Sequence, residues 1–101
     1  MGFVIVAAKK DLETAKIVGV EANGKEICLV NIGNEYYAIG NPCTHMRCML
    51  SDGELAGENI RCNCHGSVFS IKTGNVVSGP AKKPESTYEV KIEGDQIMVD
   101  V

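Results

Sequence analysis

Two short stretches in the middle of the chain, CTHMRC at residues 43–48 and CNCHGS at residues 62–67, decide how the sequence is interpreted. Together they hold both histidines of the protein and four of its five cysteines. A secreted scaffold held by disulfides would spread its cysteines along the chain and would leave the two histidines unexplained. The clustering therefore indicates a metal or cofactor site.

The segments on either side of these stretches are typical of short β-strands. Apolar and β-branched residues alternate with polar ones at 16–21 and 26–31, and the turn residues Asn23-Gly24 between them favour a hairpin. Only 10–15 is typical of a helix, while from Gly40 to Arg61 the alternation fails and turn residues dominate. Further strands are expected at 3–7, 36–39, 67–71, 75–77, 88–92 and 96–101. We expect an all-β protein, a small antiparallel sandwich or barrel.

Length and charge narrow the class of protein. The chain has 101 residues with no dividing linker, which predicts one domain over 1–101. Its net charge of −3 argues against a nucleic-acid partner and favours docking on basic protein surfaces. The apolar run Phe3–Ala8 is too short to span a membrane and has no basic residue before it, as a signal peptide would. We expect a cytoplasmic protein with no membrane span.

Read as metal ligands, the two stretches give Cys43-x-His45 and, after 16 intervening residues, Cys62-x-x-His65. Each supplies one thiolate and one imidazole. Two such pairs can hold two irons asymmetrically, with two cysteines on one iron and two histidines on the other, which is the ligand set of a Rieske [2Fe–2S] centre. Zinc also takes cysteine and histidine ligands, so a zinc-binding interaction module without a redox role remains the alternative.

The sequence resembles Rieske proteins over nearly its whole length. Beyond the two stretches, the resemblance rests on Leu50-Ser51-Asp52-Gly53, Gly66-Ser67-Val68-Phe69 and Gly79-Pro80-Ala81. It implies the Rieske fold, small antiparallel sheets with a cluster-binding loop subdomain at about 41–82 inserted in a β base. It also implies one [2Fe–2S] cluster per chain. The implied ligands are Cys43 and Cys62 on the buried iron, and His45 and His65 on the outer iron.

The same resemblance implies roles for residues around the cluster. In respiratory and photosynthetic Rieske proteins the positions of Cys48 and Cys64 form a disulfide between the ligand loops, so a disulfide is expected here. Ser67 matches a serine whose hydroxyl donates to a bridging sulfide. Gly79 and Pro80 match the loop that covers the cluster. Phe69 stands where the high-potential proteins have a tyrosine, which removes one hydrogen bond.

The function implied is that of a monomeric one-electron carrier rather than an enzyme. Electrons would come from a reductase and go to a terminal oxygenase or another redox acceptor, with the protein serving as one component of a multicomponent oxygenase. The cysteine pair and Ser67 keep a second possibility open, a high-potential carrier linked to a quinol pathway of the cytochrome bc type.

Overall fold

The computed structural model describes residues 2–44, 48–64 and 66–101. Within these ranges the chain forms short β-strands and two 3-10 turns, and no α-helix. In chain order the elements are β1 (Phe3–Ala8), η1 (Lys9–Leu12), β2 (Ile17–Ala22), β3 (Lys25–Ile32), β4 (Glu35–Gly40), η2 (Leu50–Asp52), β5 (Glu54–Ala56), β6 (Asn59–Arg61), β7 (Val68–Ser70), β8 (Val76–Ser78), β9 (Thr87–Tyr88), β10 (Val90–Glu93) and β11 (Gln96–Asp100).

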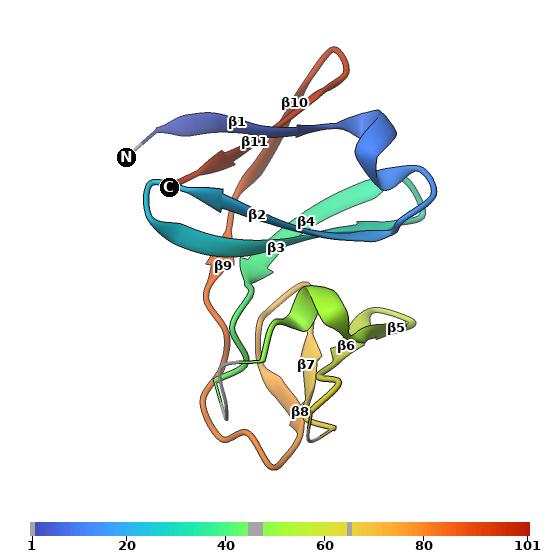
Figure 1. Cartoon of the computed structure of the whole chain (residues 1–101), viewed down its shortest axis with the longest axis vertical. Coiled ribbons are helices and arrows are strands. Elements are labelled where there is room, and N and C mark those ends of the chain that lie inside the picture. Colours follow the sequence, from blue (N-terminus) through green and yellow to red (C-terminus); the bar gives the residue numbers. More distant parts are fainter. Residues whose placement is uncertain (1, 45–47, 65) are drawn as a thin grey trace.

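The strands form three antiparallel sheets, and the all-β prediction is confirmed. The first sheet has the order β1-β11-β10, the second β2-β3-β4-β9 and the third β5-β6-β7-β8. Figure 1 shows the first two sheets stacked in the upper part of the molecule and the third below them. We call the first two sheets the β base. The third sheet, with the segments 41–53, 62–67 and 79–86, is the loop-bearing half.

Strand β3 lies between two hydrophobic cores because both of its faces are buried. Ile27 and Leu29 pack with residues of β11 in the core of the β base. Cys28 and Val30 point to the other face and pack with residues of the loop-bearing half. A run of apolar residues buried on both faces is the pattern of a central strand. The second sheet thus serves as a shared wall for the two cores.

The hairpin predicted at Asn23-Gly24 is present. Ala22 pairs with Lys25 across the turn, and both turn residues have positive φ, 52° and 75°. This is the geometry of the two-residue turns that match the twist of paired strands. The helical turn expected at 10–15 is instead a single 3-10 turn at Lys9–Leu12.

Two strands fall where the sequence predicted only loops. Strands β5 and β6 have three residues each and pair as a hairpin, with Glu54 opposite Arg61 and Ala56 opposite Asn59. Three residues are too few to show an alternating pattern, and the turn Gly57-Glu58 joins them. Across the described ranges of the chain, no helix is both long and apolar enough to cross a membrane.

Candidate metal centre

The two cysteines expected to bind iron each follow a strand, one from the β base and one within the loop-bearing half. Cys43 follows β4 and Cys62 follows β6. Their side chains are 3% and 2% exposed, belong to the same hydrophobic cluster and form no disulfide. Two free thiols are thus buried in one core, at the start of two separate loops.

The two loops are closed by the same hydrogen bond. The Cys43 N–H donates to the carbonyl of Cys48 at 2.8 Å, and the Cys62 N–H donates to the carbonyl of Ser67 at 2.7 Å. Each bond spans five residues, and each closed segment contains one of the two histidines in the sequence. The first loop is extended by a bridge between Pro42 and Met49. The backbone therefore presents the two stretches as a matched pair of hairpin-like loops.

A disulfide ties the two loops to each other. Cys48 and Cys64 are joined, with their Cα atoms 6.4 Å apart. Cys48 is the residue whose carbonyl closes the first loop, and Cys64 lies inside the second. The expected pair is thus present in the structure. The spacing between the loops is therefore fixed by this cross-link as well as by the packing of Cys43 and Cys62 in one core.

The predicted ligands His45 and His65 lie outside the described residues, as do Met46 and Arg47. Among the described residues, no group of three or more histidine, cysteine, aspartate or glutamate side chains is placed to hold a metal ion. The donor set still fits a [2Fe–2S] cluster. The two buried thiols supply soft ligands for one iron, and the sequence supplies one imidazole per loop for the other.

Ser67 and the segment after β8 are packed together beside the second loop. The Ser67 side chain is fully buried, and its Oγ accepts a hydrogen bond from the Ala81 N–H at 2.9 Å. This bond leaves the hydroxyl hydrogen of Ser67 available for another acceptor. Ala81 follows a cis peptide bond between Gly79 and Pro80 and is itself buried. The segment 79–81 is therefore anchored on the second loop.

Asn41 organises the start of the first loop, a role that the sequence did not reveal. Its Oδ1 accepts from the Ser51 N–H at 2.8 Å, and its Nδ2 donates to the Ser51 Oγ at 3.1 Å. Its carbonyl also accepts from the Leu50 N–H at 2.7 Å. A buried asparagine that bonds to a backbone nine to ten residues away fixes both ends of a loop. In the sequence, Asn41-Pro42 indicates only a turn.

Glu85 is a second residue that the sequence did not single out. It is 8% exposed, and among the described residues its Oε2 has no hydrogen-bond partner. Burial raises the pKa of the carboxyl to about 7, although the backbone N–H of Thr44 stabilises the charged form. The absence of a side chain at Gly40 leaves room for this carboxyl, because a Cβ there would lie 2.5 Å from Oε1. Burial, and then the charge of Glu85, raise the pKa of the Cys28 thiol to about 12.

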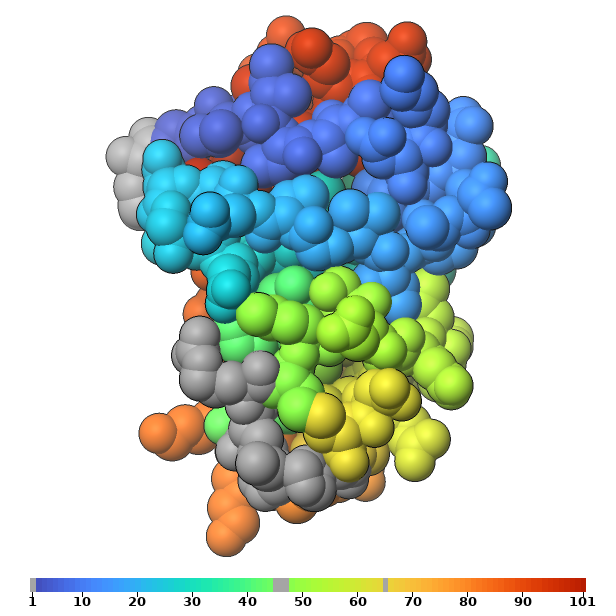
Figure 2. Space-filling view, viewed as in Figure 1, coloured from blue at the N-terminus to red at the C-terminus, as the bar shows by residue number. Residues whose placement is uncertain are grey.

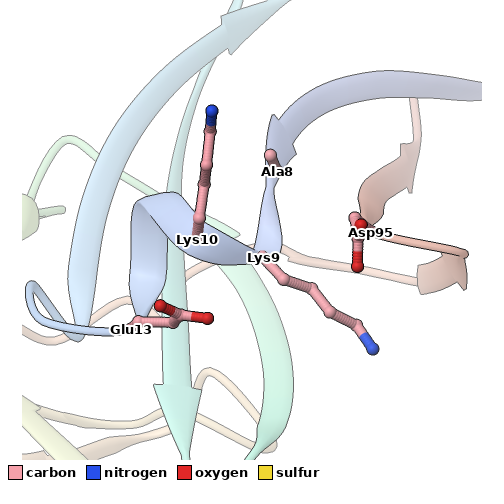
Figure 3. Close-up of a pocket in the computed structure, with 5 residues that line it drawn as sticks. All are labelled: Ala8, Lys9, Lys10, Glu13 and Asp95. Atoms are coloured by element: carbon pink, nitrogen blue, oxygen red, sulfur yellow. The ribbon is translucent and has the colours of Figure 1, made fainter.

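A surface pocket at the other end of the molecule is lined by neither cysteine nor histidine among the described residues. It lies between the end of β1, the turn η1 and the β10–β11 turn (Figure 3). Its lining combines two basic and two acidic side chains with one alanine: Ala8, Lys9, Lys10, Glu13 and Asp95. Its basic and acidic side chains balance, and we assign no ligand to it.

Comparison with known proteins identifies the family. The Rieske [2Fe–2S] domain matches residues 2–97 of this chain. The chain belongs to the Rieske [2Fe–2S] family. Among similar proteins, the ferredoxin component of the naphthalene 1,2-dioxygenase/salicylate 5-hydroxylase systems of a Ralstonia species is 39% identical over 97 residues. That alignment covers 96% of this chain and 93% of the relative.

Solved structures of Rieske ferredoxins share the fold. The ferredoxin of carbazole 1,9a-dioxygenase from Nocardioides aromaticivorans IC177 superposes with a TM-score of 0.91 at 30% identity, covering 98% of this chain and 97% of that one. A ferredoxin in a complex of reduced oxygenase and oxidised ferredoxin in carbazole 1,9a-dioxygenase gives 0.88 at 31% identity, covering 96% and 91%. This Rieske protein is thus an electron-transfer protein with one [2Fe–2S] cluster per chain, and not a zinc module.

Proposed function

We propose that this Rieske protein passes single electrons from a reductase to a terminal oxygenase in a multicomponent dioxygenase system. The observation that carries the proposal is the likeness, over nearly the whole chain, to ferredoxin components of dioxygenases. One such ferredoxin is known in a complex with its oxygenase. We also propose that the protein works as a monomer in the cytoplasm.

The proposed ligands are Cys43 and Cys62 on one iron, and His45 and His65 on the other. Two observations support this set: the thiols of both cysteines are free and buried in one core, and the same five-residue hydrogen bond closes both loops. The cluster-binding subdomain is proposed to span about 41–82. It contains both loops, the sheet β5-β6-β7-β8 and the segment 79–81.

The residues around the site have separate tasks in this proposal. When bound, the [2Fe–2S] cluster takes up and returns one electron. Cys43 and Cys62 would hold it through their thiols, which are buried in the core and shielded there from water. The disulfide between Cys48 and Cys64 keeps the two loops at one spacing, so that little rearrangement accompanies the change of charge. The segment with Gly79 and Pro80 limits the access of solvent.

Ser67 would adjust how readily the protein accepts an electron. Its Oγ already accepts from the Ala81 N–H, so its hydroxyl hydrogen is available to donate to a sulfide of the cluster. A donor at that position stabilises added negative charge and raises the reduction potential.

The disulfide and Ser67 also favour a second candidate, a high-potential carrier linked to a quinol pathway. The midpoint potential of the purified protein, measured by a redox titration followed optically, separates the two. A value near roughly −150 mV supports the oxygenase-type ferredoxin, and a value well above zero supports the quinol-linked carrier.

The ligand set is tested by comparing three buried free cysteines. Cys43→Ala and Cys62→Ala should lose iron, sulfide and the visible absorption of the cluster. Cys28→Ala, which removes an equally buried thiol from strand β3, should keep all three. His45→Ala and His65→Ala should also lose the normal spectrum. A Cys43→Ala protein with a full complement of iron and an unchanged spectrum would refute the assignment.

A further inference from the structure

Two adjacent lysines form a basic patch at the lower end of the loop-bearing half. Lys82 and Lys83 are exposed, and with Thr44 and Pro80 they line a shallow surface pocket of about 500 Å³. Among the described residues, no carboxylate lines this pocket. In Figure 2 the segment around residues 80–84, in orange, projects from the lower end of the molecule. We call Lys82 and Lys83 the lysine pair.

The lysine pair is fixed next to the first ligand loop. The Thr44 Oγ1 donates to the carbonyl of Lys83 at 2.6 Å, and Thr44 stands between Cys43 and His45 in the sequence. On the other side of the pair, the Ala81 N–H donates to the Ser67 Oγ of the second loop at 2.9 Å. Hydrogen bonds to both ligand loops therefore hold the backbone of the pair in place.

Negative charge in this half lies elsewhere. Glu85, two residues after Lys83, is turned into the core. Glu58 pairs with Lys72 at 3.0 Å, and Glu54 is the cross-strand neighbour of Arg61. Asp52, the fourth acidic residue of this half, lies on η2, which contacts β2 and β3 of the β base. Figure 1 shows β5, which carries Glu54, on the opposite side of this half from the segment with the lysine pair.

The net charge of the whole chain hides this local excess of positive charge. Residues 41–86 contain five basic and four acidic side chains, whereas the rest of the chain contains five basic and nine acidic ones. The molecule is 38 Å long. Because salt screens charges beyond about 10 Å at 0.1 M ionic strength, a partner at the lower end responds to the nearby charges and not to the distant acidic residues.

We propose that the electron acceptor of this protein docks with an acidic surface against Lys82 and Lys83, beside the first ligand loop. The inference rests on the proposed function and adds the chemistry of the partner. It reverses the expectation drawn from the net charge of −3, because the charge at the electron-exchange end has the opposite sign. Charge of this kind sets the rate and orientation of encounter more than the final affinity.

The test uses two small one-electron oxidants of opposite charge. Reduced, cluster-loaded protein gives one electron to hexacyanoferrate(III), which becomes hexacyanoferrate(II), or one electron to tris(phenanthroline)cobalt(III), which becomes cobalt(II). Rates are measured by stopped flow at about 10 mM and about 500 mM ionic strength. The variants are Lys82→Glu/Lys83→Glu and, as a matched control, Lys9→Glu/Lys10→Glu in the distant pocket of Figure 3.

Reversing the charge of the lysine pair should lower the rate of electron transfer to the anionic oxidant roughly tenfold at low salt and raise the rate to the cationic oxidant. Both changes should disappear at high salt. The control variant, which changes the net charge equally, should alter either rate far less. The same pattern is expected with protein acceptors: electron transfer to an acidic plastocyanin should become slower, and electron transfer to a basic cytochrome c should become faster. Iron content and visible spectrum should match the wild type in both variants, because Lys10, Lys82 and Lys83 are exposed and Lys9 lines a surface pocket.

Equal effects of the two double variants would overturn the proposal, because they would show that only the net charge matters. An unchanged rate in Lys82→Glu/Lys83→Glu would overturn it as well. Failure of the proposed function has a different signature: the midpoint potential of the wild-type protein would lie well above zero, whereas the rates with the two oxidants would still report the charge beside the first ligand loop.

Discussion

The β base and the loop-bearing half of this Rieske protein are held together by different means. The base has strands of up to eight residues, long hydrogen-bonded ladders and an aliphatic core centred on Ile27, Leu29 and Ile97. The third sheet has strands of only three residues. Its loops depend on a disulfide and on single hydrogen bonds between segments far apart in the sequence. Regular pairing thus stabilises one region, and cross-links position the other.

Removing the disulfide should produce the largest difference in local stability between the β base and the loop-bearing half. The Cys48→Ala/Cys64→Ala protein loses a cross-link that closes a loop of 16 residues, and about 3 kcal/mol of stability should go with it. Because the bond lies wholly in the loop-bearing half, amide hydrogen exchange should accelerate in β6, β7 and β8. The amides of β3 and β11 should stay close to their wild-type protection. A uniform rise in exchange over both regions would show that they unfold as one unit.

Glu85 provides a test at the boundary between the two regions. Its pKa in the folded protein is raised to about 7 from 4.5, so the folded state keeps this carboxyl protonated over a range where the unfolded chain has lost the proton. Its contribution to stability is therefore full below about pH 4.5 and falls as the pH rises to about 7. At about 1.4 kcal/mol per pKa unit, the loss reaches roughly 3 kcal/mol.

The Glu85→Gln protein should lack this pH dependence and should be more stable than the wild type at pH 8. Urea unfolding of the cluster-loaded protein at pH 5 and pH 8, followed by far-UV circular dichroism, measures the difference. Glu54→Gln, at an exposed position on β5, is the control and should keep the pH profile of the wild type. If Glu85→Gln and the wild type lose stability equally between the two pH values, the burial of Glu85 does not govern the profile.

The smallest effect is expected in the β base, at the β2–β3 turn. Gly24 has a φ of 75°, which disfavours any residue with a Cβ, so Gly24→Ala should cost about 1 kcal/mol. Gly2→Ala is a matched control, since no atom lies within 4 Å of the added Cβ at either position and Gly2 has no positive φ. The visible spectrum of the cluster should be unchanged in both. A shift of the spectrum in Gly24→Ala would mean that strain in the base reaches the ligand loops.

The sequence predicts the two regions unequally well, and strand length explains the difference. The hairpin of β2 and β3 was predictable because two segments rich in apolar and β-branched residues flank a turn that needs positive φ. Strands β5 and β6 were missed because three residues show no period. The proposed ligand residues were chosen without reference to any strand, because the spacing of cysteine and histidine in 43–48 and 62–67 carries its own chemical meaning.

Glu85 could not be found from the sequence for another reason. Pro84-Glu85-Ser86 has the composition of an exposed turn, and nothing nearby in the chain indicates burial. Its environment is set by Gly40, 45 residues earlier, and by the backbone of Thr44 in the first ligand loop. Burial that depends on contacts between distant segments leaves no local pattern.

Strand β3, with Leu29 on one face and Cys28 on the other, limits which segment of this protein could be transplanted into another scaffold. A cassette cut from residues 41–86 and grafted onto a new scaffold would leave Cys28, Val30 and Ile39 behind, and with them one wall of its own core. A transplant that keeps the electron-transfer centre intact would have to carry the β3–β4 hairpin as well. The receiving scaffold would then need an apolar surface shaped to accept Ile27 and Leu29.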